Sequence, residues 1–177
     1  MYAYDLLSFD PVYSDENDLH CRPARESDLD SMLAIEESSF EFPWSRDDFL
    51  FCLRASRCEA IVIERDAAVV GYAIYERRSS SIRLLSLAVA AVARRHGVGA
   101  ALFGALVALL DDKRREIVCT ASERNVVARR FLQRLGFRSR WVERKFYREI
   151  DCAAHRMVFS LDERFAYVDS HDVKKAG

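Results

Sequence analysis

Proline is scarce in this chain, and long apolar runs are missing. Only three of the 177 residues are proline and half are hydrophobic, so extensive disorder is not expected. No apolar run approaches the roughly 20 residues of a transmembrane helix, and the first residues lack the pattern of a secretory signal. A chain of this length normally forms one domain. These absences predict a compact cytoplasmic protein that does not bind membranes.

Paired cysteines and metal-binding motifs are also missing. The chain has five cysteines, an odd number, and they are scattered with no Cys-x-x-Cys pair or histidine partner at metal-site spacing. We therefore expect reduced thiols and no metal site. The cysteines are Cys21, Cys52, Cys58, Cys119 and Cys152.

Two well-known phosphate-binding motifs do not occur. The Gly-Lys-Ser/Thr end of a Walker loop is absent. A dinucleotide-binding fingerprint would need a third glycine at position 102, where Leu102 stands.

The chain instead has a basic, glycine-containing stretch at 94–100, Arg-Arg-His-Gly-Val-Gly-Ala. It follows an apolar run at 84–89 and precedes an apolar segment at 101–107, which predicts a strand, a tight turn and a helix. The first N–H groups of a helix are unpaired and lie at the positive end of its dipole, so they attract anions. Glycine at 97 and 99 lets a phosphate approach the backbone. By itself this segment also fits a plain turn with surface arginines.

Two further segments have recognisable ends. Asn125 is suited to begin a helix and Gly136 to end it, with Val127, Phe131 and Leu135 expected as its core-facing stripe. The stretch at 40–45, Phe-Glu-Phe-Pro-Trp-Ser, is an aromatic loop whose serine is suited to cap the next helix. Such a loop is typical of a hydrophobic staple as well as of a binding groove.

Together these segments resemble the GNAT superfamily of N-acetyltransferases. Arg94, Gly97 and Gly99 match the Arg-x-x-Gly-x-Gly of its acetyl-CoA pyrophosphate loop, and residues 125–137 match the helix after its fifth strand. Residues 42–45 are similar to the Phe-Pro-Trp-Ser loop of bacterial ribosomal-protein N-terminal alanine acetyltransferases. Residues 144–147 and 153–157 resemble that group's last hairpin, with Phe146 in place of a Tyr and Ala153 in place of an Asp.

The resemblance implies the GNAT fold, an α/β (α+β) architecture with a central mixed, mostly antiparallel sheet of about seven strands and helices on both faces. We expect an N-terminal extension at 1–18, the acetyltransferase domain at 19–161 and a C-terminal tail at 162–177. The expected strands are 19–24, 58–64, 69–76, 81–89, 116–120, 137–147 and 155–161, and the expected helices are 27–38, 45–54, 98–114 and 125–135.

The resemblance also implies an enzyme that uses acetyl-CoA as co-substrate. The pantetheine arm would bond to the backbone of the fourth strand, and the pyrophosphate would lie on the turn that follows. The implied cofactor-binding residues are Leu87, Ala88, Val89, Arg94, Arg95, His96, Gly97, Val98, Gly99, Ala100, Asn125 and Ala128.

The implied acceptor is the α-amine of a peptide or protein, a ribosomal protein being one candidate. The implied substrate-binding residues are Phe42, Pro43, Trp44 and Tyr147. No usual catalytic residue is present: the position of the family's Glu base is Thr120, that of its Tyr acid is Leu132, and Arg83 stands where another subgroup has Tyr. Glu123 and Tyr147 remain as candidates. We therefore expect slow transfer that favours α-amines, with pKa near 8, over lysines near 10.4.

Charge is distributed unevenly along the chain. Residues 1–50 contain thirteen acids and three bases, whereas residues 113–148 contain twelve bases and three acids. The basic part suits the anionic co-substrate, and the acidic part suits a cationic amine. Two alternatives stay open: a GNAT protein acting on a small amine or lysine side chain, and a catalytically weak module that binds ribosomes or nucleic acid, although nucleic acid is not the expected partner. The sequence leaves open whether the protein is a monomer or a homodimer.

Overall fold

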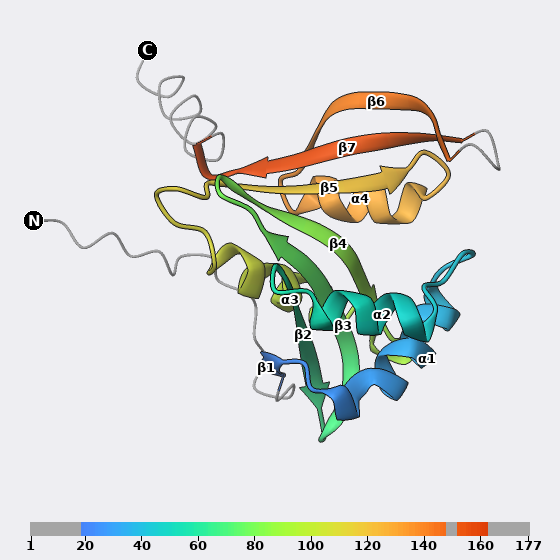
Figure 1. The fold of residues 1–177 in the computed structure, drawn as a ribbon. Coiled ribbons are helices and arrows are strands. Elements are labelled where there is room, and N and C mark those ends of the chain that lie inside the picture. The colour runs from blue at the N-terminus through green and yellow to red at the C-terminus, as the bar shows by residue number, and fades with distance from the viewer. Residues whose placement is uncertain (1–18, 148–151, 163–177) are drawn as a thin grey trace, which may run out of the picture.

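The computed structural model describes residues 19–147 and 152–162, apart from the side chains of Lys145 and Tyr147 (Figure 1). The expected extension at 1–18 and all but the first residue of the expected tail at 162–177 lie outside the described residues.

A seven-stranded sheet forms the centre of the molecule, in the order β1-β2-β3-β4-β5-β7-β6. Only β4 and β5 run parallel, and every other neighbouring pair is antiparallel. The expectation of a mixed, mostly antiparallel sheet is confirmed. The strands are β1 His20–Pro23, β2 Cys58–Arg65, β3 Ala68–Arg77, β4 Ser81–Val89, β5 Glu116–Ser122, β6 Arg138–Tyr147 and β7 Cys152–Ser160.

The parallel pair at the centre of the sheet separates soon after it begins. Residues 81–83 of β4 pair with residues 116–118 of β5, and the two ribbons then diverge (Figure 1). The pairing between β3 and β4 shifts register at Ile74/Tyr75, which leaves Leu85 as an extra residue in β4. In the described strands, the second half of β4 therefore has a sheet neighbour on one edge only.

Helices cover both faces of the sheet, as expected. Helices α1 and α2 pack on one face through a core that includes Met32, Phe49 and Tyr72. Helices α3 and α4 pack on the other through a core that includes Leu102, Leu132 and Phe159. The α-helices are α1 Leu29–Ser39, α2 Arg46–Arg54, α3 Val98–Val107 and α4 Val126–Arg134, and short 3₁₀ turns lie at Glu26–Asp28 and Ala91–Ala93.

Both predicted ends of α4 are confirmed. The Asn125 side chain accepts a hydrogen bond from the N–H of Ala128 at 2.9 Å and so caps the helix. Gly136 has φ +95° and follows the last turn, where its N–H donates to the carbonyl of Gln133. The next N–H, of Phe137, donates to the carbonyl of Leu132, which completes a Schellman motif.

Two details of the helices differ from expectation. Helix α3 ends at Val107 and not at 114, because the Asp111 carboxylate accepts the N–H groups of Lys113 and Arg114 and closes a turn there. The basic residues at 113–115 therefore do not lie on the last turn of this helix. In α4 the expected stripe is wrong at Val127, which is 81% exposed. Phe131 and Leu135 do pack against the core, and Leu132 is the residue of α4 that is buried in it.

Candidate functional site

The turn before α3 presents an uninterrupted run of unpaired backbone donors. Arg95 and Gly97 have φ of +67° and +79°, and α3 begins at Val98. Within the described part of the chain, the N–H groups of residues 95–100 have no hydrogen-bond acceptor, and the first paired one is that of Ala101, bonded to the carbonyl of Gly97 at 2.9 Å. Consecutive unpaired donors at the positive end of a helix are suited to bind an anion.

The two glycines of this turn do different things. Gly97 adopts a left-handed conformation, and a side chain there would meet no atom within 4 Å. A Cβ on Gly99 would instead lie 2.9 Å from Cζ of Phe131 on α4. Gly99 is therefore needed for the contact between α3 and α4, a role that the sequence reasoning did not assign.

Arg94 ties the turn to its surroundings. Its Nε donates to the carbonyl of Val89 at 3.0 Å, and its Nη2 donates to the hydroxyl of Ser39 at 3.0 Å. The guanidinium thus joins the end of β4 to the end of α1, and two of its N–H groups are already used.

The expected pantetheine-binding residues lie in the second half of β4, beyond the residues that pair with β5. Ala88 packs on the α1 side of the sheet, and Leu87 and Val89 pack on the α3 side. Their backbone groups border the gap between β4 and β5, directly before the turn described above.

The aromatic loop before α2 is a capping box with a hydrophobic staple. Ser45 caps α2 by accepting from the N–H of Asp48, whose carboxylate in turn accepts the N–H of Ser45 at 2.8 Å. Trp44, one residue before the cap, packs edge-on against Phe49 with ring centroids 5.8 Å apart. Phe42 in the same loop is 63% exposed. The structure therefore fixes Trp44 and leaves Phe42 available at the surface.

A buried polar network behind this loop was missed by the sequence reasoning. Glu36, only 2% exposed, accepts the N–H of Trp44 on Oε1 at 3.0 Å and the hydroxyl of Tyr72 on Oε2. Ser86, on the bulged part of β4, lies 3.1 Å from the Tyr72 oxygen. A signal was present, because Glu36 continues the spacing of the buried residues Leu29 and Met32 along α1.

The direction of these hydrogen bonds can be assigned. Burial, followed by the hydrogen bond to Glu36, raises the pKa of Tyr72 far above its ordinary value, so its hydroxyl keeps its proton. That proton goes to Glu36, and the Ser86 hydroxyl therefore donates to the Tyr72 oxygen. The network joins the aromatic loop to β3 and to the edge of β4.

The residues at the expected catalytic positions lie on β5, on α4 and at the ends of β5 and β6. Thr120 is exposed on β5, on the face opposite α4. Leu132 is buried at 8% exposure and cannot donate a proton. Glu123 accepts the N–H of Ala153 at 3.0 Å and thereby ties β5 to β7. Tyr147 pairs with Cys152 at the end of the last hairpin, and its side chain lies outside the described residues.

Cys119 and Cys52 are not suited to act as nucleophiles. Burial raises the pKa of Cys119 to about 12 and, with smaller contributions from neighbouring groups, that of Cys52 to about 11. Both thiols stay protonated at neutral pH. In the described part of the chain there is also no cluster of three or more His, Cys, Asp or Glu residues that could hold a metal ion.

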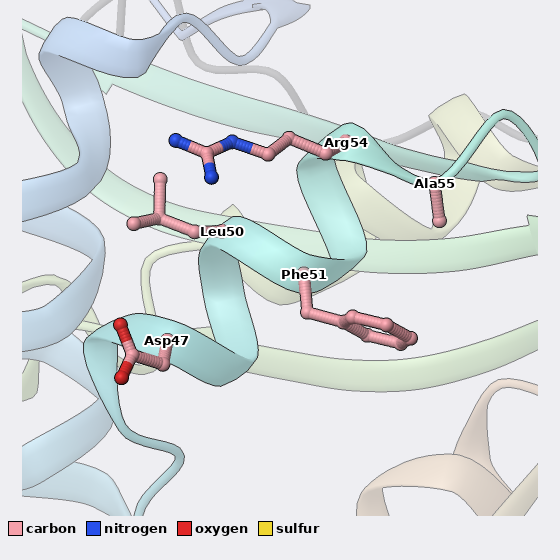
Figure 2. A pocket seen from close by; sticks show the side chains of 5 residues that line it. All are labelled: Asp47, Leu50, Phe51, Arg54 and Ala55. Atoms are coloured by element: carbon pink, nitrogen blue, oxygen red, sulfur yellow. The ribbon is translucent and has the colours of Figure 1, made fainter.

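A shallow hollow runs along α2, directly after the aromatic loop. It is lined by Asp47, Leu50, Phe51, Arg54 and Ala55. Figure 2 shows Leu50 and Arg54 projecting from one side of the helix and Phe51 from the other. Phe51 is 75% exposed and was not among the predicted site residues. Among the described helices, none is long and apolar enough to cross a membrane.

Comparisons with known proteins agree with this geometry. The sequence profile of the Acetyltransferase (GNAT) family matches residues 27–137. An uncharacterized N-acetyltransferase of Methanocaldococcus jannaschii is 32% identical over 131 residues, 72% of this chain and 83% of the relative. A putative ribosomal protein bS18-alanine N-acetyltransferase of Bacillus subtilis is 26% identical over 128 residues, 71% of this chain and 85% of the relative.

A similar fold is found in the structure of Arabidopsis thaliana NAA60 in complex with acetyl-CoA. The TM-score is 0.70 at 17% sequence identity, with 81% of this chain and 99% of that chain covered. The match to the family profile over residues 27–137 and the relative that is 32% identical establish that the chain belongs to the acetyltransferase (GNAT) family.

Proposed function

We propose that this acetyltransferase moves the acetyl group of acetyl-CoA to the α-amine of a peptide or protein N-terminus. The acetyl-CoA side of this proposal depends on one observation, that the six consecutive N–H groups of residues 95–100 have no acceptor among the described residues. A pyrophosphate would satisfy them, and the glycine at 97 leaves open space beside the turn. The chain's own residues therefore fit acetyl-CoA.

The other expected contacts with acetyl-CoA follow from this placement. The backbone of Leu87, Ala88 and Val89 would bond the pantetheine arm, because none of the described strands pairs with that edge of β4. The main role of Arg94 would be to position the turn through its bonds to Val89 and Ser39, and contact with the phosphate would be secondary. Asn125 and Ala128, at the first turn of α4, would border the same arm.

The acceptor half is supported by the loop before α2. Residues 42–44 lie on the face of the sheet that also carries Thr120, and that face is opposite the α3 side. A peptide would lie between this loop and the β6–β7 hairpin, where Tyr147 ends β6. The Bacillus subtilis relative named for ribosomal protein bS18 makes a protein N-terminus the acceptor class to test first.

The proposed reaction needs little acid–base catalysis from the protein's side chains. When bound, acetyl-CoA supplies an acetyl thioester. The neutral amine forms a C–N bond to the acetyl carbon, the C–S bond breaks, the CoA thiolate leaves, and the amine releases a proton to solvent. With threonine at the base position, the amine must arrive neutral, and the difference between pKa values near 8 and 10.4 disfavours lysine by about 3 kcal/mol.

The test is release of CoA thiol from acetyl-CoA with defined acceptors. Peptides with free N-termini should be acetylated slowly, with a rate that rises with pH toward the amine pKa, while N-terminally blocked lysine peptides react far less. Equal turnover of blocked lysine peptides or of spermidine would overturn the proposal. Absence of turnover with every amine would leave only a binding role for the chain.

A further inference from the structure

A row of three side chains crosses the face of the sheet that is opposite α3 and α4. Thr120 on β5 pairs directly with Arg156 on β7, which pairs directly with Trp141 on β6. Directly paired residues of antiparallel strands point to the same face. Their neighbours Cys119 and Met157 lie in the core under α3 and α4, so this row lies on the opposite face, with Thr120 at its inner end.

Arg156 is held in place by an aromatic ring. Its guanidinium carbon lies 4.7 Å from the centroid of the Trp141 ring, a cation–π stack. Arg156 is half-buried and Trp141 is 50% exposed. A cation–π contact uses the face of the planar guanidinium, so the N–H groups in its plane are not used by the ring.

The cation has no carboxylate partner among the described residues. No ion pair or hydrogen bond joins the Arg156 guanidinium to any described side chain, although Glu143 lies on the same face, paired with Ala154. An oriented and unpaired guanidinium is suited to bidentate contact with a carboxylate.

Building on the proposed function, we propose that Arg156, stacked on Trp141, binds a carboxylate of the acceptor. The acceptor then has an acidic side chain a few residues after its reactive α-amine. Neighbouring strands are about 4.8 Å apart, so two strand spacings separate Thr120 from the Trp141 stack by about 10 Å. An extended peptide rises about 3.4 Å per residue, which places the acidic residue among positions 2 to 4.

The test compares matched peptides in the thiol-release assay. Three peptides carry Asp at position 2, 3 or 4, each is paired with its Asn twin, and all share a free N-terminal alanine. At one of these positions, we expect kcat/KM to be about tenfold higher for the Asp peptide, as for a charge-assisted hydrogen bond. Because the twins differ only in charge, the ratio isolates the contact with a cation.

Variants of Arg156 assign that cation. Arg156→Met should bring the Asp/Asn ratio close to one, and Arg156→Lys should keep part of it, since the charge remains but the planar fork is lost. Arg156→Glu should reverse the preference toward a Lys-containing peptide. Arg57→Met, which removes an exposed cation from the turn before β2, is the matched control and should keep the full ratio.

Each outcome is decisive. Equal turnover of the Asp and Asn peptides at all three positions would overturn this inference and leave the proposed function intact. A ratio that survives both Arg156→Met and Arg156→Glu, in variants shown to be folded by circular dichroism, would assign the preference to another cation. If no peptide were turned over, the proposed function would fail first, and this inference would fail with it.

Discussion

The carboxylate of Glu36 accepts a hydrogen bond from the backbone N–H of Trp44 at 3.0 Å, linking α1 to a loop residue eight positions later. The other carboxylate oxygen accepts the hydroxyl of Tyr72, which in turn is bonded by Ser86 at 3.1 Å. The loop proposed to bind the acceptor is thereby fixed to the same part of β4 that is proposed to bind the acetyl donor. A change in this network should therefore affect how the acceptor is held.

Removing the Glu36 carboxylate should separate the two substrates in the kinetics. Glu36→Ala leaves the Trp44 N–H and the Tyr72 hydroxyl without their acceptor, at a cost of about 1–3 kcal/mol in unfolding free energy. We expect a higher KM for the peptide and an unchanged KM for acetyl-CoA. Glu36→Gln can still accept from Trp44 and should recover most of the loss. If both variants raised the KM for acetyl-CoA instead, the network would belong to the donor side.

Substitutions of the two glycines in the turn should destabilise the protein for different reasons. Gly99→Ala places a Cβ 2.9 Å from the Phe131 ring, so we expect a lower melting temperature that the second change Phe131→Leu partly restores. Gly97→Ala meets no atom but must adopt φ +79°, at a cost of about 1–2 kcal/mol. Thermal unfolding and calorimetric titration with CoA measure both effects. Failure of Phe131→Leu to restore any stability would contradict the proposed packing role of Gly99.

Local signals made much of this fold predictable. The caps at Ser45, Asn125 and Gly136 depend on bonds within a few residues, and each was placed correctly. The strand at 81–89 was placed correctly because its apolar run ends at the turn. The end of α3 was misplaced because an aspartate turn at 111 competes with a pattern that otherwise continues to suggest a helix.

The least predictable features depend on residues far apart in the sequence. Arg156 reaches Trp141 only because a register shift between Ser139 and Trp141 sets which residues of β6 and β7 face each other. Glu36, likewise, meets Tyr72 across 36 residues. No periodic pattern encodes such pairings. The sequence predicted a turn at 94–100 before a helix, and its role in binding stays a prediction, whereas the packing role of Gly99 and the bonds of Arg94 are visible only in the structure.

A carboxylate at the position of the family's base should raise turnover, but Arg156 will limit the gain. Thr120 is exposed, so Thr120→Glu should fold normally, whereas Leu132→Tyr would overpack a buried site by about 1–3 kcal/mol. Arg156 pairs directly with residue 120 and would lower the pKa of the new carboxyl, which weakens it as a base. We therefore expect a larger gain from Thr120→Glu combined with Arg156→Met, measured as kcat on a neutral peptide across pH. A slower double variant with intact CoA binding would indicate that another group is the base.

The ion-pair group at the start of the domain predicts how stability depends on pH. Asp28, nearly buried, pairs with Arg22 at 2.7 Å and accepts the N–H of Arg25 at 2.7 Å, and the hydrogen bond from Arg22 is the main cause that lowers the Asp28 pKa. Because this pKa is lower in the folded than in the unfolded chain, where it is near 3.9, the unfolded chain binds the proton first as pH falls. The stabilisation is therefore complete above about pH 5 and is lost as pH drops through the folded pKa.

The variant Asp28→Asn tests this pH dependence. It should lower the free energy of unfolding by about 2 kcal/mol at pH 7 in urea unfolding, and the difference in unfolding free energy from the native protein should narrow below pH 4. The control Glu37→Gln, an exposed carboxylate on α1, should change stability little at either pH. A gap for Asp28→Asn that stayed constant from pH 7 to pH 3 would show that its effect does not come from the charge of the carboxylate.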